Sequence, residues 1–240
     1  MPTRRRSPAY RLLRGAGLLF FGWLAAMAAA VIAMRWIDPP TTAFMLRDRF
    51  DAFATGERGY TFRYQWRDWS AISADAGVAV IAAEDQAFPL HDGFDFRQID
   101  RALADRERGR RMRGASTITQ QVAKNLFLWP GQNWFRKGLE AGLTILIEIT
   151  WSKQRILEVY LNIAEFGRGT WGVEAASQRF FRKSAARLTA SDAALLAAVL
   201  PNPRRMRVHA PSAYVRRRQQ EILGQMASIG GPAVLNRLGD

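Results

Sequence analysis

The sequence contains no cysteine and only two histidines, His91 and His209, among its 240 residues. The absence of cysteine excludes disulfide bonds, thiolate zinc sites and a cysteine nucleophile. The two histidines stand far apart in the chain, which argues against a histidine-rich metal site. No internal repeat or low-complexity segment is visible. The chain is long enough for one good core, or for a core with a small addition.

Acidic residues are also scarce, since 21 Asp and Glu stand against 35 Lys and Arg and give a formal net charge of +14. The first 35 residues contain six arginines and no acid: Arg4, Arg5, Arg6, Arg11, Arg14 and Arg35. Subtracting these six charges from +14 leaves a net charge of +8 on the rest of the chain. Such a surplus fits an anionic partner, namely nucleic acid, a lipid headgroup surface or a phosphorylated substrate.

Residues 15–34 form a run of 20 uncharged residues that is rich in Leu, Ala and Phe. At about 1.5 Å per residue this run spans about 30 Å, the thickness of a bilayer core. We therefore predict a transmembrane helix over residues 15–36. By the positive-inside rule, the preceding arginines predict a cytoplasmic tail over residues 1–14 and place the remaining chain outside the inner membrane.

A cleaved signal peptide is the alternative interpretation, because Ala28, Ala29 and Ala30 provide small residues near a cleavage site. The apolar run continues through Met34 and is longer than most signal-peptide cores, which favours an uncleaved anchor. Nucleic acid is a poor candidate partner in that compartment. A phosphate-bearing lipid at the membrane surface satisfies both the charge and the anchor.

Residues 37–69 read as a membrane-proximal segment between the anchor and the main domain. Leu46, Phe50 and Phe53 fall on one helical face, which predicts an amphipathic helix. That face either packs on the domain core or lies against the bilayer. Residues 56–69 alternate aromatic and polar residues, which fits one short strand or an irregular segment.

The remaining domain, residues 70–240, has an almost entirely helical pattern, so the predicted fold class is all-α. Helices are expected at residues 70–84, 96–107, 117–128, 134–150, 152–163, 172–180, 189–199 and 212–228. No convincing alternation of apolar and polar residues predicts strands there.

Two adjacent carboxylates, Glu84 and Asp85, directly follow the apolar residues 78–83 at the C-terminal end of a predicted helix. The helix dipole is negative there, so these anions cost stability unless a cation or a functional need offsets them. A carboxylate pressed against apolar surface favours its protonated form, which is how proteins make a general acid or base. The structural alternative is that Asp85 caps a turn and Glu84 pairs with an arginine.

A second polar cluster opens the helix predicted at residues 117–128. Thr117 and Gln120 match a capping box, which is a sufficient structural explanation for that pair. Gln121, Lys124 and Asn125 share one face of the helix. A helix N-terminus with a nearby lysine suits a phosphate, and side-chain amides suit sugar hydroxyls. The preceding loop contains glycine and is expected to be mobile; its cations are Arg108, Arg110, Arg111 and Arg113.

Arg136, Lys137 and Glu140 form a third cluster, because one helical face can hold all three. On a wet surface such an ion pair adds only about 0.3–0.5 kcal/mol. The surrounding helix is strongly apolar, so Glu140 and Glu148 are candidates for burial, and a buried acid needs partners.

Residues 167–172 spell the G-x-G-x-x-G pattern of dinucleotide-binding sites. We reject that interpretation because the preceding sequence has helical periodicity and no βαβ unit surrounds it. The glycines instead predict a loop that turns sharply and closely approaches a ligand or another helix.

These segments, in this order and spacing, closely resemble the peptidoglycan glycosyltransferases. Residues 84–93 match the first motif of that family, residues 114–121 the second, residues 136–140 the third, residues 156–162 with the glycine loop the fourth, and residues 197–203 resemble its closing motif. The resemblance covers roughly residues 70–205. It implies a lysozyme-like helical glycosyltransferase domain with a small membrane-proximal subdomain. With no room for a transpeptidase domain in the sequence, it is the monofunctional form that the chain resembles.

The resemblance implies that the chain polymerises lipid II, forming β-1,4 bonds with inversion and releasing undecaprenyl pyrophosphate. Glu84 is implied as the catalytic base, and Glu140 as a second catalytic-site acid that organises cations or the donor site. The implied substrate-binding residues are Asp85, His91, Ser116, Thr117, Gln121, Lys124, Asn125, Arg136 and Lys137. Many relatives carry an arginine near Gln132 and Asn133, so Lys124 with Arg136 or Lys137 is expected to carry more of the phosphate contact here.

No protein metal ligands are expected, although a divalent cation, Mg²⁺ or Mn²⁺, could assist at the donor pyrophosphate. The implied partners are lipid II, the growing lipid-linked glycan chain, the inner membrane, and other cell-wall synthesis and division proteins, with no nucleic acid. Two other classes remain open. A lysozyme-like hydrolase or lytic transglycosylase would also use a glutamate but needs no lipid anchor. A non-catalytic scaffold for cell-wall assembly would keep its function without Glu84.

Overall fold

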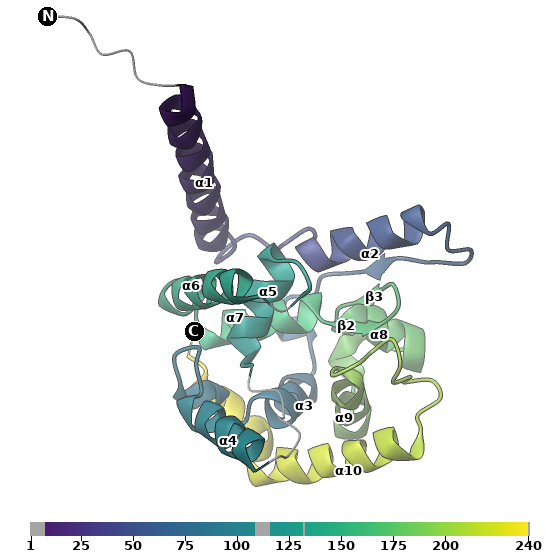
Figure 1. Cartoon of the computed structure of the whole chain (residues 1–240). Coiled ribbons are helices and arrows are strands. Elements are labelled where there is room, and N and C mark those ends of the chain that lie inside the picture. Colours follow the sequence, from purple (N-terminus) through teal and green to yellow (C-terminus); the bar gives the residue numbers. More distant parts are fainter. Residues whose placement is uncertain (1–7, 109–115, 132, 240) are drawn as a thin grey trace, which may run out of the picture.

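The N-terminal apolar run forms helix α1, Pro8–Ala33, which stands away from the body of the molecule (Figure 1). The computed structural model describes residues 8–108, 116–131 and 133–239. Within these ranges, Tyr10–Ala33 is the one stretch of helix that is long and apolar enough to cross a membrane. The helix starts and ends earlier than the predicted span of residues 15–36. Apolarity marks only the part suited to lipid, whereas helical hydrogen bonding extends further toward the N-terminus.

The C-terminal end of α1 is fixed to the body where helix α6, Trp134–Thr150, meets helix α7, Lys153–Ile163. Met27 and Val31 are buried at this contact. The indole Nε1 of Trp151 donates to the carbonyl oxygen of Val31 at 2.8 Å, and the guanidinium of Arg155 donates to the carbonyl of Met34. The apolar helix therefore joins the body through directed hydrogen bonds rather than through a free linker.

Each helix expected beyond residue 69 is present. Those not yet given are α3 Ala74–Glu84, α4 Phe96–Glu107, α5 Ile118–Phe127, α8 Val173–Phe181, α9 Ala190–Val199 and α10 Ala213–Ser228. Polar caps set several of the starts: Thr117 and Thr189 make complete capping boxes, and Ser152 and Ser212 accept from backbone N–H groups. The all-α prediction is confirmed, apart from three short strands.

Helix α3 is the centre of the core, and its residues Ala76 to Ala82 are all buried. It packs against α9, α10 and α7. A helix that is apolar on every side must be surrounded on every side, and α9 meets the same requirement with its own buried run. Glu84, the last residue of α3, and Asp85, which follows it, therefore lie where the apolar core ends.

The three strands form one small sheet in the order β1-β3-β2. Strand β1, Arg63–Tyr64, lies in the segment for which one short strand was an open prediction, and it pairs in parallel with β3, Thr170–Trp171. Strand β2, Glu165–Gly167, pairs antiparallel with β3. The hairpin of β2 and β3 was missed by the sequence analysis because strands of two or three residues are too short to show alternation.

The glycines of the 167–172 segment serve close backbone approach, as the sequence analysis predicted. Gly169 has φ of +68°, and a Cβ at this position would lie 2.4 Å from the carbonyl oxygen of Thr61 in the approaching chain. Gly172 has φ of +83°, and its Cβ would lie 2.5 Å from the carbonyl oxygen of Asn162. The G-x-G-x-x-G pattern therefore encodes a tight hairpin against helix α7, not a nucleotide loop.

Helix α2, Ala43–Ala54, is amphipathic, with its buried face formed by Met45, Asp48 and Ala52. The face that the sequence analysis singled out points the other way: Leu46 and Phe50 are exposed, and Phe53 is 85% exposed. Packing of that face on the domain core is therefore wrong for this chain. Other large apolar side chains are exposed between the end of α5 and the first turn of α6, among them Trp129, Trp134 and Phe135.

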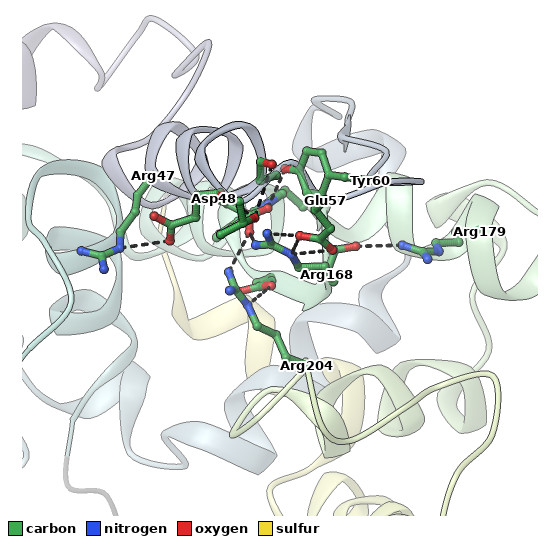
Figure 2. A network of polar contacts seen from close by, with 12 residues as sticks. Arg47, Asp48, Glu57, Tyr60, Arg168, Arg179 and Arg204 are labelled. Carbon is green, nitrogen blue, oxygen red and sulfur yellow. Dashed lines mark hydrogen bonds and ion pairs between the residues drawn. The ribbon is translucent and has the colours of Figure 1, made fainter.

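Asp48 is a buried carboxylate that joins α2 to the β2–β3 turn and to the segment after α9 (Figure 2). It accepts hydrogen bonds from the Tyr60 hydroxyl at 2.8 Å and from the Trp171 indole at 3.1 Å. It also forms ion pairs with Arg168 in the β2–β3 turn and with Arg204 after α9. A buried carboxylate is tolerated when it is paired and hydrogen-bonded in this way. The exposed apolar face of α2 is thus held in a fixed orientation.

Candidate active site

Glu84 is the last residue of α3 and is partly exposed where the core meets solvent. Its Oε2 accepts a hydrogen bond from Nε2 of Gln121 at 2.7 Å. The amide oxygen of Gln121 accepts in turn from the hydroxyl of Tyr160 in α7 at 3.3 Å. Tyr160 is buried, so this chain of bonds fixes the Gln121 amide and, through it, the carboxylate.

Burial raises the pKa of Glu84 above its ordinary value. The hydrogen bond from Gln121 and the positive charges of Arg218 and Lys124 act in the opposite direction and lower the pKa, while the neighbouring Asp85 raises it. A carboxyl group whose pKa is raised by burial, and which is hydrogen-bonded on one side, has the properties of a general acid or base.

Lys124 lies one helical turn beyond Gln121 on α5, between two carboxylates. Burial lowers its pKa, and the charges of Glu140 and Glu84 raise it. Its ammonium group lies 5.8 Å from the ring centroid of Phe44 at the start of α2. Among the described residues, Lys124 forms no ion pair at contact distance. Its charge is therefore available to an anion.

Glu140 of α6 is buried, with 2% of its surface exposed, and both of its carboxylate oxygens are engaged. Arg136 donates from Nη1 to Oε2 at 2.7 Å, and Lys137 pairs with Oε1. Arg136 is itself buried, and its Nε–H has no hydrogen-bond partner among the described atoms. The predicted burial of Glu140 is therefore confirmed, and of the three side chains only Lys137 reaches solvent.

Asp85 and His91 bond to each other and to backbone N–H groups next to this cluster. Asp85 is 1% exposed and accepts from Nε2 of His91 at 2.9 Å and from the backbone N–H of Ile118 at 3.0 Å. Nδ1 of His91 accepts from the N–H of Gly93, so the imidazole proton is on Nε2. Asp85 therefore stabilises the N-terminus of α5 as well as the loop after α3, and Glu84 pairs with an amide instead of an arginine.

The loop that follows α3 is held by hydrogen bonds and an ion pair that involve residues in or next to α5, α6 and α7. Thr117 donates to the carbonyl of Gly93, and Thr119 donates to Glu148, whose side chain is 7% exposed. Lys153 pairs with Glu148 and donates to the carbonyl of His91. These bonds connect the first and second motif segments on the two sides of the site.

The structure thus brings Glu84, Gln121, Lys124, Arg136, Lys137 and Glu140 into one electrostatically coupled cluster. Asp85, His91 and Thr117 support it from within the protein. Ser116 is exposed and Asn125 partly exposed at the two ends of α5. Residues 109–115 of the expected mobile loop and Gln132 lie outside the described residues, whereas Asn133 caps the N-terminus of α6 by accepting from the N–H of Arg136.

Two residues of the site were missed by the sequence analysis. Tyr160 lies in a segment interpreted mainly as scaffold, and its hydroxyl completes the hydrogen bonds behind Glu84. Arg218 lies in α10, beyond the motif segments, and contacts the end of α3 from 135 residues away in sequence. Tyr160 stands within the fourth motif segment, but its contact with Gln121 is created only by the tertiary fold, and no local pattern marks Arg218.

The described residues contain no group of three or more His, Asp or Glu side chains placed to hold a metal ion. Glu84 and Asp85 are adjacent, but Asp85 is committed to His91 and Ile118. Glu140 is committed to two cations. The residues present therefore do not fit a protein-held divalent cation.

Comparison with known proteins gives a consistent result. A family model described as transglycosylase matches residues 53–227. Proteins named biosynthetic peptidoglycan transglycosylase are similar to this chain at 54% identity in Cronobacter sakazakii, covering 96% of both chains. The identity is 56% in Citrobacter koseri, covering 89% of both chains. It is 50% in Xanthomonas campestris, covering 98% of this chain and 94% of the relative.

Proposed function

This chain belongs to the transglycosylase family and is a peptidoglycan glycosyltransferase that polymerises a lipid-linked glycan, and on that premise we propose that it elongates glycan strands from lipid II with Glu84 as the general base. The observation that carries the assignment is the hydrogen bond from Gln121 to a half-buried Glu84 beside a cluster of three cations. Among the described residues this is the place where a proton acceptor and an anion-binding surface meet.

In the proposed reaction Glu84 accepts the proton of the 4-hydroxyl group of the acceptor sugar. The oxygen attacks the anomeric carbon of the donor, the new glycosidic bond forms, and the bond from that carbon to the pyrophosphate oxygen breaks. The electron pair leaves with undecaprenyl pyrophosphate, and the proton remains on Glu84 until solvent removes it. Attack opposite the leaving group converts an α-linked donor into a β-1,4 bond.

The departing pyrophosphate gains negative charge, which nearby cations stabilise in the transition state. Lys124, Arg136 and Lys137 are the proposed cations. Lys124 is free of ion pairs within the described chain, and the buried Nε–H of Arg136 has no hydrogen-bond partner among the described atoms. Glu140 holds the two residues of α6 in place and therefore acts as their organiser. Gln121, Asn125 and Ser116 are proposed to contact sugar or phosphate oxygens.

Asp85, His91 and Thr117 were expected to bind substrate as well. Their polar atoms are used in bonds that connect α3, α5 and the intervening loop. We therefore propose that they act on the substrate through the geometry of this frame.

A divalent cation, if used, is proposed to be carried by the pyrophosphate oxygens of the substrate, since the described side chains offer no cluster for it. No step above depends on it.

The proposed location is the outer face of the inner membrane, with the N-terminus in the cytoplasm. The apolar helix α1 is consistent with a membrane anchor, and the exposed face of α2, with Leu46, Phe50 and Phe53, would then rest in the lipid interface. In this proposed arrangement the site would face the membrane surface from which a lipid-linked pyrophosphate emerges.

Polymerisation of labelled lipid II by the detergent-solubilised full chain tests the proposal. The wild type is expected to form long glycan strands, and Glu84→Gln almost none while keeping its circular dichroism spectrum. If the wild type instead shortened purified peptidoglycan, the hydrolase interpretation would be correct. Normal polymerisation by Glu84→Gln would leave the reaction intact and remove Glu84 from its assigned role.

A further inference from the structure

Arg218 of α10 contacts the end of α3 that carries Glu84. Its Nη2 donates to the carbonyl oxygen of Ala83 at 3.1 Å, and its Nη1 lies 3.3 Å from Oε2 of Glu221. Most of the guanidinium side chain is covered, with 25% exposed. Helix α10 begins at Ala213 and therefore lies outside every segment to which a catalytic role has been assigned.

The carbonyl groups in the last turn of a helix lack helical partners and carry the negative end of its dipole. In α3 the carbonyl of Ala82 accepts from the neutral side-chain amide of Gln86 at 3.1 Å. The carbonyl of Ala83 accepts from Arg218, which brings a full positive charge to the residue preceding the base. Arg218 thus offsets the negative helix end at the point where Glu84 must be ionised to accept a proton.

Charged and polar groups face Glu84 from several elements. Burial and Asp85 favour its protonated form, whereas Gln121, Arg218 and Lys124 favour its ionised form. The hydroxyl of Tyr160 from α7 lies behind Gln121. Lys124 is also a proposed ligand of the leaving pyrophosphate, and a bound phosphate would partly neutralise its charge. Arg218 comes from a different helix and has Ala83 and Glu221 as its partners, so its effect on Glu84 persists when the donor is bound.

We propose that Arg218 is a positioning residue for the glycosyl transfer, which holds the C-terminal end of α3 and keeps Glu84 ionised while the donor substrate occupies the cation cluster. The inference rests on the proposed role of Glu84 as the base. Arg218 touches no reacting atom in this scheme and acts through the Ala83 carbonyl and through its charge.

The test is the pH dependence of kcat/KM for lipid II polymerisation by the full chain, measured for wild type, Arg218→Gln, Arg218→Lys and Arg217→Gln. In Arg218→Gln the acidic limb is expected to move to higher pH, so that activity falls roughly three- to tenfold on the acidic limb of the wild-type profile and recovers as the pH rises. Arg218→Lys keeps the charge and is expected to keep the wild-type limb. Arg217 is exposed on the same helix, so Arg217→Gln removes an equal charge as the matched control.

An equal loss of activity at every pH in Arg218→Gln would show a merely structural contact and overturn the proposal, as would an unmoved limb. If the Gln variant fails to fold, the comparison of Arg218→Lys with Arg218→Met gives the same decision. Failure of the base assignment looks different, because Glu84→Gln would then polymerise normally and the wild type would lack the acidic limb.

Discussion

At the scale of single residues, opposing interactions act on the pKa of Glu84. Burial at the end of α3 favours the protonated form of Glu84, and one amide with two cations favours the ionised form. The raised pKa that results lowers the stability of the folded chain wherever Glu84 must ionise. Its ordinary value is 4.5, so the stability associated with the neutral form is fully present below that pH and is lost as the pH rises through the raised value.

Glu84→Gln is therefore expected to stabilise the fold at pH 7.5 while it abolishes polymerisation. A gain of about 1 kcal/mol corresponds to an increase in Tm of about 2–4 °C for a domain of this size. The difference from wild type is expected to vanish near pH 4, where Glu84 is neutral in both the folded and the unfolded state. Thermal unfolding at the two pH values checks this, and a Gln variant that is less stable at pH 7.5 would contradict it.

Glu140→Gln is expected to be severe, because it leaves the buried guanidinium of Arg136 without its anion. Breaking a buried pair by removing one partner costs about 3–5 kcal/mol, and misplaced cations at the leaving group lower kcat by about a hundredfold or more. Lys137→Met removes the solvent-exposed partner of the same carboxylate. This matched variant is expected to lose activity without a change in Tm. Equal Tm values for the two variants would contradict the assigned burial.

The residues of the site that could be predicted from sequence are those that stand in local patterns. Glu84 follows an apolar run, and Lys124 and Gln121 share a helical face. The hydrogen bonds of Asp85 with Ile118 and of His91 with Gly93 could not be predicted, because these contacts exist only in the folded chain. The hydrogen bond from Arg218 to the carbonyl of Ala83 could not be predicted for the same reason.

At the scale of elements, the β2–β3 hairpin is fixed by glycine geometry. Gly172→Ala would place a Cβ 2.5 Å from the Asn162 carbonyl, at φ of +83°. The expected cost is about 2–3 kcal/mol or more. Gly224 is a control of the same chemistry in the interior of α10, where an added Cβ meets no atom within 4 Å. Gly224→Ala is expected to stabilise the chain by about 0.5–1 kcal/mol.

Urea unfolding of the two alanine variants compares them directly. The midpoints should move in opposite directions from that of the wild type. A Gly172→Ala variant with an unchanged midpoint would show that the hairpin can relax away from α7.

Helices were more predictable than strands in this chain. The capping residues Thr117, Thr189 and Ser212 mark helix starts in the sequence itself. The sheet depends on pairing between residues about 107 positions apart, Arg63 with Thr170, which no local pattern encodes. The face of α2 that contains Phe50 and Phe53 was seen as apolar, but its orientation depends on Asp48, whose partners lie far along the chain.

At the scale of the whole molecule, the orientation across the membrane can be tested cleanly because the sequence has no cysteine. Thr3→Cys and Ser228→Cys place single thiols before α1 and at the exposed end of α10. In intact spheroplasts, a membrane-impermeant maleimide is expected to label the second variant only. Labelling of the first is expected after permeabilisation. Labelling of Thr3→Cys in intact spheroplasts would contradict a cytoplasmic N-terminus.

The network around Asp48 also constrains the order in which the chain can be completed during synthesis. Helix α2 leaves the ribosome early, whereas Arg168 and Arg204 follow 120 and 156 residues later. Until both have emerged, α2 has a charged group that must stay hydrated, so the helix cannot settle on the body. A chain interrupted before residue 204 would therefore lack one of the cations that pair with Asp48, and the orientation of the exposed apolar face of α2 would no longer be fixed by this network.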